Sequence, residues 1–134
     1  MKQLLCILIA VFSFCVAQAE PVFYRASYFS YKCLEDNECW TSWSDWEDSK
    51  ILISFDVEKE VIKVYSEQDQ RYVIVEVNEQ YKDKQGGEQC EMTVVDQDGD
   101  VGVIRLRIQK NSVAQLYVEF NNIMWVYSGL RPIQ

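Results

Sequence analysis

The sequence contains no histidine. This absence excludes Ser-His-Asp and Cys-His catalytic triads, histidine-ligated zinc and most general-base chemistry near neutral pH. The sequence also lacks a glycine-rich phosphate loop, because its Gly86-Gly87 pair lies in a polar stretch with no helix predicted after it. It has no Ser-x-x-Lys element, and its carboxylates suggest no particular pair for glycoside hydrolysis. We therefore predict a protein that is not an enzyme and that carries no cofactor.

Positive charge is scarce: 13 Lys and Arg stand against 21 Asp and Glu, and the net charge is −8. Such a surface repels phosphate backbones and anionic membranes, so nucleic acid is excluded as a partner. The only long apolar run, residues 4–16, follows Lys2 and precedes Ala17-Gln18-Ala19. This order is typical of a secretory signal peptide, here residues 1–19. The run is shorter than the ~20 residues of a membrane-spanning helix. We expect residues 20–134 to be exported, periplasmic or secreted, and monomeric.

Cysteine is also sparse after residue 19, where Cys33, Cys39 and Cys90 remain. Three scattered thiols are too few for a four-cysteine zinc site. In an oxidising compartment they allow one disulfide and one free thiol. We predict a bridge between Cys33 and Cys39 that closes an acidic loop. The alternative is that Cys90 pairs with one of the other two.

Apolar and polar residues alternate with a period of two along most of the sequence. Ile104, Leu106 and Ile108, for example, alternate with Arg105 and Arg107. This period indicates half-buried β-strands, and no stretch after residue 19 shows sustained helical periodicity. Eight strands are predicted, separated by short turn sequences, at 22–31, 50–56, 60–66, 71–78, 89–96, 101–109, 114–120 and 122–129.

The predicted fold is a single all-β domain over residues 20–134, an antiparallel meander of about eight strands. Strands with one apolar face must hide their edges, and closure into a small β-barrel achieves this. The barrel is therefore expected to be closed or nearly closed. A two-sheet β-sandwich is the alternative.

Trp40, Trp43 and Trp46 recur at intervals of three just before the strand that contains Phe55. The Ser, Thr and Asp residues between them favour irregular backbone over a helix. The rings are expected either to cap one end of the sheet or to line the mouth of a ligand pocket. In the pocket interpretation Phe55 and Phe120 lie in the interior beneath them.

The sequence Asp96-Gln-Asp98-Gly-Asp100 resembles the start of a calcium loop. The glycine comes too early for an EF-hand, and residue 107, where the twelfth-position glutamate would fall, is Arg. Asp-Gly between alternating strands also predicts a hairpin turn. We favour the turn and keep Asp96, Asp98 and Asp100 as a weak calcium candidate.

The leader, the tryptophan-rich stretch and the segments 61–74, 94–102 and 115–127 together resemble small exported lipocalin-like or related β-barrel proteins of Gram-negative gut bacteria. That group has no established activity, so the resemblance implies a fold and no reaction. Two functions remain open. The first is a module that binds a small molecule or carbohydrate. The second is a protein-interaction, inhibitor or envelope component with a filled core, in which tyrosines such as Tyr65, Tyr72 and Tyr117 would be anchors.

Overall fold

The computed structural model describes residues 21–133, and every regular element in this range is a β-strand. The predicted signal peptide, residues 1–19, lies outside the described residues. No helix found in the described part is long and apolar enough to cross a membrane. The strands are β1 Val22–Arg25, β2 Tyr28–Cys33, β3 Glu47–Asp48, β4 Leu52–Asp56, β5 Val61–Tyr65, β6 Gln70–Lys82, β7 Glu88–Val95, β8 Val101–Ile108, β9 Ala114–Phe120, β10 Ile123–Ser128 and β11 Arg131–Pro132.

The eleven strands form one sheet in the order β11-β1-β4-β5-β6-β7-β8-β9-β10-β2-β3. All neighbouring strands are antiparallel, and from β4 to β10 each strand pairs with the next one in the chain. The predicted all-β antiparallel meander is therefore confirmed. Seven of the eight predicted strands are present as single strands, and the first, predicted at 22–31, is divided into β1 and β2. The two-residue strands β3 and β11 were not predicted.

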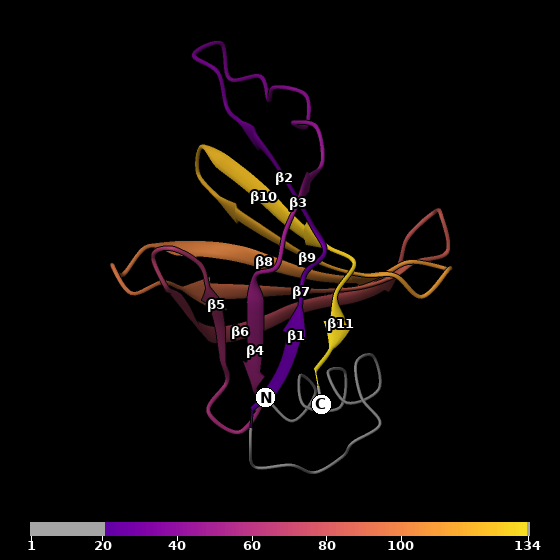
Figure 1. The fold of residues 1–134 in the computed structure, drawn as a ribbon. Helices are drawn as coiled ribbons and strands as arrows, with labels where there is room; N and C mark the ends of the chain where they lie inside the picture. Colours follow the sequence, from indigo (N-terminus) through magenta and orange to yellow (C-terminus); the bar gives the residue numbers. More distant parts are fainter. Residues whose placement is uncertain (1–20, 134) are drawn as a thin grey trace.

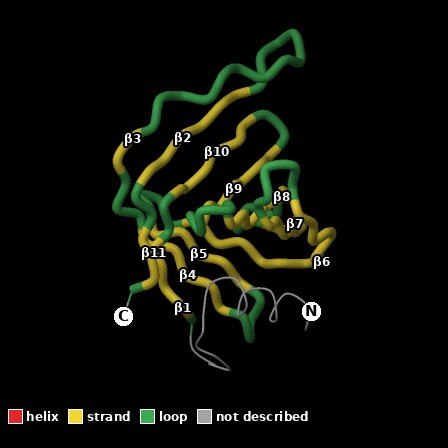
Figure 2. The backbone as a smooth tube through the Cα atoms, turned by 90° about the vertical axis from the view of Figure 1, so that its right-hand side faces the viewer, coloured by secondary structure: helices red, strands yellow, loops and turns green. Residues whose placement is uncertain are grey.

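The sheet bends at one corner, where three neighbouring connections lie: β1 to β2, β3 to β4, and β10 to β11. The chain turns at Ala26 and Ser27 between β1 and β2, and backbone hydrogen bonds continue through the turn from Ser27 N to Ser128 O (3.0 Å) and from Ser49 N to Ser27 O (2.8 Å). Gly129 has a φ of 65°, and a Cβ there would lie 3.0 Å from the Ser27 Cβ. The corner thus requires a glycine. It separates β1, β4 and β11 from β2, β3 and β10 (Figures 1 and 2).

The expected closed barrel is a wrong prediction, because the sheet runs from β11 to β3 without closing. An open, sandwich-like sheet describes it better. The physical reason is the corner: strands that change direction between two parts of a sheet are the way in which sandwich-like folds turn. A barrel would need the same strands to continue without interruption.

The apolar core lies on the inner face of this bent sheet. Ile104 and Leu106 of β8 are almost fully buried, and their cross-strand partners Met92, Leu116 and Val118 are buried with them. Residues paired across strands share a face, so Arg105, Arg107 and their partners form the outer face. The alternation of apolar and polar residues predicted from the sequence thus determines which side chains face the core and which lie on the outer face.

Candidate functional site

The segment between β2 and β3, residues 34–46, runs along the free side of β2. Ser44 N donates a hydrogen bond to Tyr31 O (2.7 Å), and Ser30 Oγ donates to Ser44 O (2.7 Å). Leu34 and Trp40 form an isolated bridge within the segment. These bonds fix an otherwise irregular backbone next to the outer face of the sheet, and they position the tryptophan side chains.

Trp43 reaches across the outer face to Tyr117 of β9. Their ring centroids are 6.0 Å apart in an edge-to-face arrangement. The Nζ atom of Lys32 lies 4.8 Å from the centroid of Trp43 and 5.6 Å from that of Trp40. The three tryptophans do not form one ladder, because Trp46 contacts Tyr28 instead, at 6.5 Å. Their spacing of three therefore does not gather them at the mouth of an interior pocket.

A surface cavity of about 480 Å³ opens beside Trp43 on this outer face. Its walls come from β2, β7, β8, β9, β10, the segment 34–46 and the turn between β6 and β7. The cavity is lined by Lys32, Trp43, Asp83, Lys84, Gln85, Gln89, Arg105, Arg107, Tyr117 and Met124. Four of these ten residues are basic and one is acidic, which is the reverse of the balance in the whole chain.

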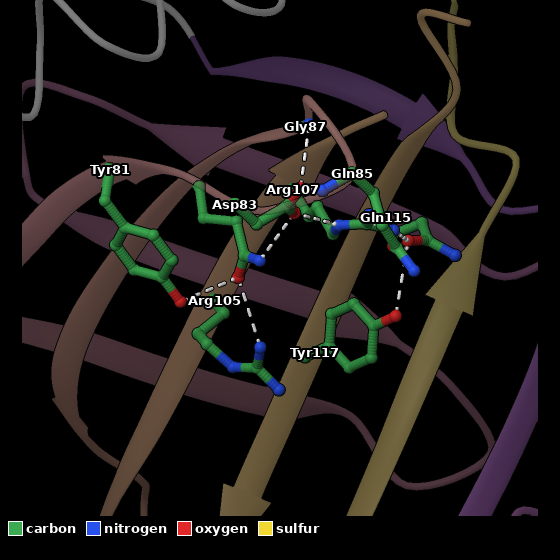
Figure 3. Close-up of polar contacts among 9 residues, drawn as sticks. Tyr81, Asp83, Gln85, Gly87, Arg105, Arg107, Gln115 and Tyr117 are labelled. Atoms are coloured by element: carbon green, nitrogen blue, oxygen red, sulfur yellow. Dashed lines mark hydrogen bonds and ion pairs between the residues drawn. The ribbon is translucent and has the colours of Figure 1, made fainter. Parts of the chain in front are cut away.

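Asp83 and Arg107 form the ion pair at one wall of the cavity, with 2.8 Å between Asp83 Oδ2 and Arg107 Nε (Figure 3). The carboxylate also accepts hydrogen bonds from the backbone N–H of Gly87 (2.8 Å) and Gln85 (3.0 Å) and from Gln89 Nε2 (2.9 Å). The Arg107 guanidinium and then these donors hold the pKa of Asp83 well below its usual range. The carboxylate in turn raises the pKa of Arg107. This pair is fixed and neutral overall.

Glutamine side chains extend this network across the outer face. Arg107 donates to Gln85 Oε1 (2.8 Å) and to Gln115 Oε1 (3.2 Å), and the hydroxyl of Tyr117 also donates to Gln115 Oε1 (3.3 Å). Gln115 is buried and donates from Nε2 to Ser128 Oγ (3.1 Å). Tyr117 is thereby held at both ends, by Trp43 at its ring and by Gln115 at its hydroxyl.

Arg105 differs from Arg107 in its partners. Its Cζ lies 4.6 Å from the ring centroid of Tyr117, and its Nη1 donates to Gln89 Oε1 (3.1 Å), which also accepts from Tyr81 (Figure 3). Glu91 is its cross-strand neighbour in β7. No ion pair joins them, however, and Arg107–Asp83 is the one ion pair found among residues 21–133. Arg105 is thus directed toward the cavity by neutral groups.

Phe55 and Phe120 lie away from the cavity, so the five residues predicted to bind ligand are not brought together. Phe55 is buried in the core, edge-to-face with Tyr24 at 5.6 Å. Phe120 stacks on Trp125 at 6.2 Å, and a Cβ at Gly102 would lie 2.7 Å from its ring. Both are packing residues here, and of the predicted set only Trp43 lines the cavity.

Asp96, Asp98 and Asp100 form the turn between β7 and β8. Asp96 Oδ1 accepts hydrogen bonds from the backbone N–H of Asp98 and Asp100, both at 2.9 Å, and Gly99 has a φ of 85°. One carboxylate oxygen from each aspartate lies within 4.8 Å of the others. These bonds account for the sequence as a hairpin turn, as favoured, and the calcium site stays a prediction.

The predicted disulfide is absent, because Cys33, Cys39 and Cys90 are free thiols in the structure. The register of the local hairpin explains this. Thr41 N donates to Cys33 O and Glu35 N donates to Cys39 O, both at 2.8 Å. Each cysteine therefore faces a different residue, and the two are diagonal rather than opposite. Burial raises the pKa of the Cys90 thiol to about 11.

The residues that sequence reasoning missed are Lys32, Gln89, Arg105 and the Asp83–Arg107 pair. The available signal was the presence of two arginines on the polar face of one predicted strand in an acidic chain. No family model, curated protein or solved structure matches the chain. The resemblance to lipocalin-like proteins accordingly stays a prediction.

Proposed function

We propose that the protein is an exported binding module without catalytic activity, and that its ligand is a small molecule or a carbohydrate unit bound in the cavity beside Trp43 and Tyr117. The observation that carries this proposal is the cavity itself. Its volume of about 480 Å³ is within the range of ligand sites. Trp43 is 39% exposed at its wall, so part of its ring is accessible to a ligand.

The chemistry of the walls supports a ligand with both apolar and hydroxyl surfaces. Trp43 and Tyr117 offer apolar ring surface, whereas Gln85, Gln89 and Arg105 offer hydrogen-bonding groups. Sugar rings present C–H groups on one face and hydroxyls around the edge. A site of this composition matches both kinds of surface.

The lack of catalysis is supported by the state of the polar groups. A general base must hold a pKa near the working pH, and the pKa of Asp83 is shifted in the opposite direction by its donors. Asp83 is also the one carboxylate among the cavity-lining residues. Export is supported by the signal-peptide pattern of residues 1–19.

The alternative, a protein-interaction surface anchored by tyrosines, gains no specific support. Tyr72 is buried, Tyr117 is engaged in the cavity wall, and Tyr65 stacks on Phe23 at 6.2 Å. These three rings do not share one exposed surface.

The proposal is tested by NMR titration of the labelled protein with a panel of mono- and oligosaccharides. We expect shifts centred on the Trp43 indole N–H and the Gln89 side-chain amide. Trp43→Ala should weaken binding about tenfold or more, as stacked aromatic contacts do. Trp46→Ala is the matched control, because Trp46 is 55% exposed and does not line the cavity. Equal losses in both variants, or shifts confined to other surfaces, would contradict the proposal.

A further inference from the structure

The cavity positions two of its cations with neutral partners. Lys32 is held over the rings of Trp40 and Trp43, and Arg105 is held over Tyr117. A ring attracts a cation through its quadrupole, but it carries no net charge. The side chains are therefore oriented without being neutralised, in contrast to Arg107, whose charge is balanced by Asp83.

This arrangement is unusual in a chain with an excess of carboxylates. The protein has 21 acidic residues against 13 basic ones. Nevertheless Lys32, Lys84 and Arg105 line one cavity without an ion pair to any described residue. Like charges gathered in one place repel one another. A bound anion would remove that repulsion, and the cavity provides the space for it.

The Arg105 guanidinium has donors available for a planar anionic group. The side chain donates from Nη1 to Gln89 Oε1, which leaves Nε and Nη2 without an acceptor among the described residues. A guanidinium offers its donors as a fixed fork that matches carboxylate or sulfate oxygens. Lys32, whose Nζ lies over the Trp43 ring, supplies a second, point-like charge in the lining of the same cavity.

The aromatic pair indicates the shape of the rest of the ligand. Trp43 and Tyr117 meet at an interplanar angle of 67°. They form a corner and not a parallel slot. Flat aromatic ligands gain most from parallel stacking on both faces, whereas a puckered ring needs only one apolar face and hydrogen bonds around its rim. The corner therefore fits a sugar ring better than a flat aromatic ring.

We infer that the ligand of this cavity is an acidic sugar, a pyranose unit that carries a carboxylate or a sulfate group. The ring lies against Trp43 and Tyr117, and the acidic group is bound by Lys32 and Arg105. This inference rests on the proposed binding function and specifies its ligand class. Carboxylate and sulfate share the required chemistry, and the experiment below separates them.

The test uses three matched trisaccharides: trigalacturonate, its neutral counterpart α-1,4-galactotriose, and the 6-O-sulfated form of the neutral sugar. Binding is measured by calorimetry and by the Trp43 indole N–H shift. We expect at least one acidic sugar to bind about tenfold or more tightly than the neutral one, as charge-assisted hydrogen bonds require. The preference should shrink as salt rises from about 50 mM to about 500 mM, because screening weakens exposed ion pairs.

Two variants localise the effect. Arg105→Gln and Lys32→Met should each reduce the preference for the acidic sugar over the neutral one severalfold, because each removes one of the two charges that bind the acidic group. Lys63→Met and Arg71→Gln are the controls, because both residues are exposed on β5 and β6 and neither lines the cavity. Melting temperatures check that each variant is folded, and Lys32→Met keeps the test decisive should Arg105→Gln not fold.

The outcomes separate the inference from the function on which it rests. Equal binding of neutral and acidic sugars at Trp43 would overturn the acidic ligand and leave the binding module intact. Inorganic sulfate that binds at Arg105 as tightly as the sulfated sugar would show that the ring contributes nothing, which overturns the sugar. If no trisaccharide moves the Trp43 signal, both the inference and the proposed carbohydrate binding fail.

Discussion

The substitution of Val118 by Thr tests whether the inner face is as dry as the fold requires. Val118 is fully buried in β9, and its cross-strand partners are Ile104 and Trp125. Threonine has nearly the same shape and a similar preference for strands. The change therefore replaces one buried methyl group by a hydroxyl with little steric effect. Val75→Thr in β6 is the matched control, because Val75 is 50% exposed.

The expected cost follows from these surroundings. Loss of one buried methyl removes about 0.8 kcal/mol, and a hydroxyl buried without a partner costs about 1–3 kcal/mol in proteins. Val118→Thr should thus lower the free energy of unfolding by about 2–4 kcal/mol, or the melting temperature by about 10 °C. Val75→Thr should change the free energy of unfolding by less than about 0.5 kcal/mol.

Urea unfolding followed by tryptophan fluorescence measures both variants. The midpoint should fall for Val118→Thr with an unchanged slope, since the slope reports the surface exposed on unfolding. Similar midpoints for the two variants would refute the assignment of inner and outer faces. Val118 would then not be packed against Ile104 and Trp125 as the structure shows.

Three further outcomes are expected. Because burial raises the pKa of Cys90 to about 11 from 9.0, native protein at pH 8 should leave this thiol unalkylated while exposed Cys39 reacts. Its neutral form is favoured by folding, so its contribution to the free energy of unfolding should be intact below pH 9 and decline as the pH rises from 9 toward 11, a slope that Cys90→Ala removes. Gly87→Ala places a Cβ 2.9 Å from Asp83 Oδ2 and 3.2 Å from Arg107 Nε, so it should separate this ion pair. Carboxyl NMR should then show the pKa of Asp83 moving back toward its usual value, and an unchanged titration would contradict the geometry.

The strands were predictable because burial on one face imposes a period of two, as in Ile104 and Leu106. The corner was not, because it lies within a stretch that reads as one strand. Tyr24 and Ala26 face the core before the bend, and Phe29, which contacts Tyr127, faces it afterwards. The inward position thus changes from even to odd residues. A one-residue change of this kind reverses the two faces of a strand, and the sequence contains it only as a lapse in alternation.

The candidate site was harder to predict for a different reason. Arg105 and Tyr117 occupy positions on the polar face of their strands, where alternation indicates solvent and nothing more. Their partners Lys32 and Trp43 come from β2 and from the irregular segment after it. Because this segment is irregular, its sequence has no periodicity that would indicate where it contacts the sheet. The tryptophan spacing did not indicate that Trp46 would contact Tyr28 while Trp43 contacts Tyr117.

The two arginines of β8 show how one strand face acquires two different electrostatic roles. Arg105 and Arg107 point the same way and differ by two residues, yet within residues 21–133 only Arg107 has a carboxylate partner. The turn between β6 and β7 causes this difference, because its backbone N–H groups hold Asp83 beside Arg107. Gln89 bridges the two positions: it donates to Asp83 and accepts from Arg105. The Asp83–Arg107 pair thereby positions the Gln89 amide, and this neutral amide orients Arg105 without balancing its charge.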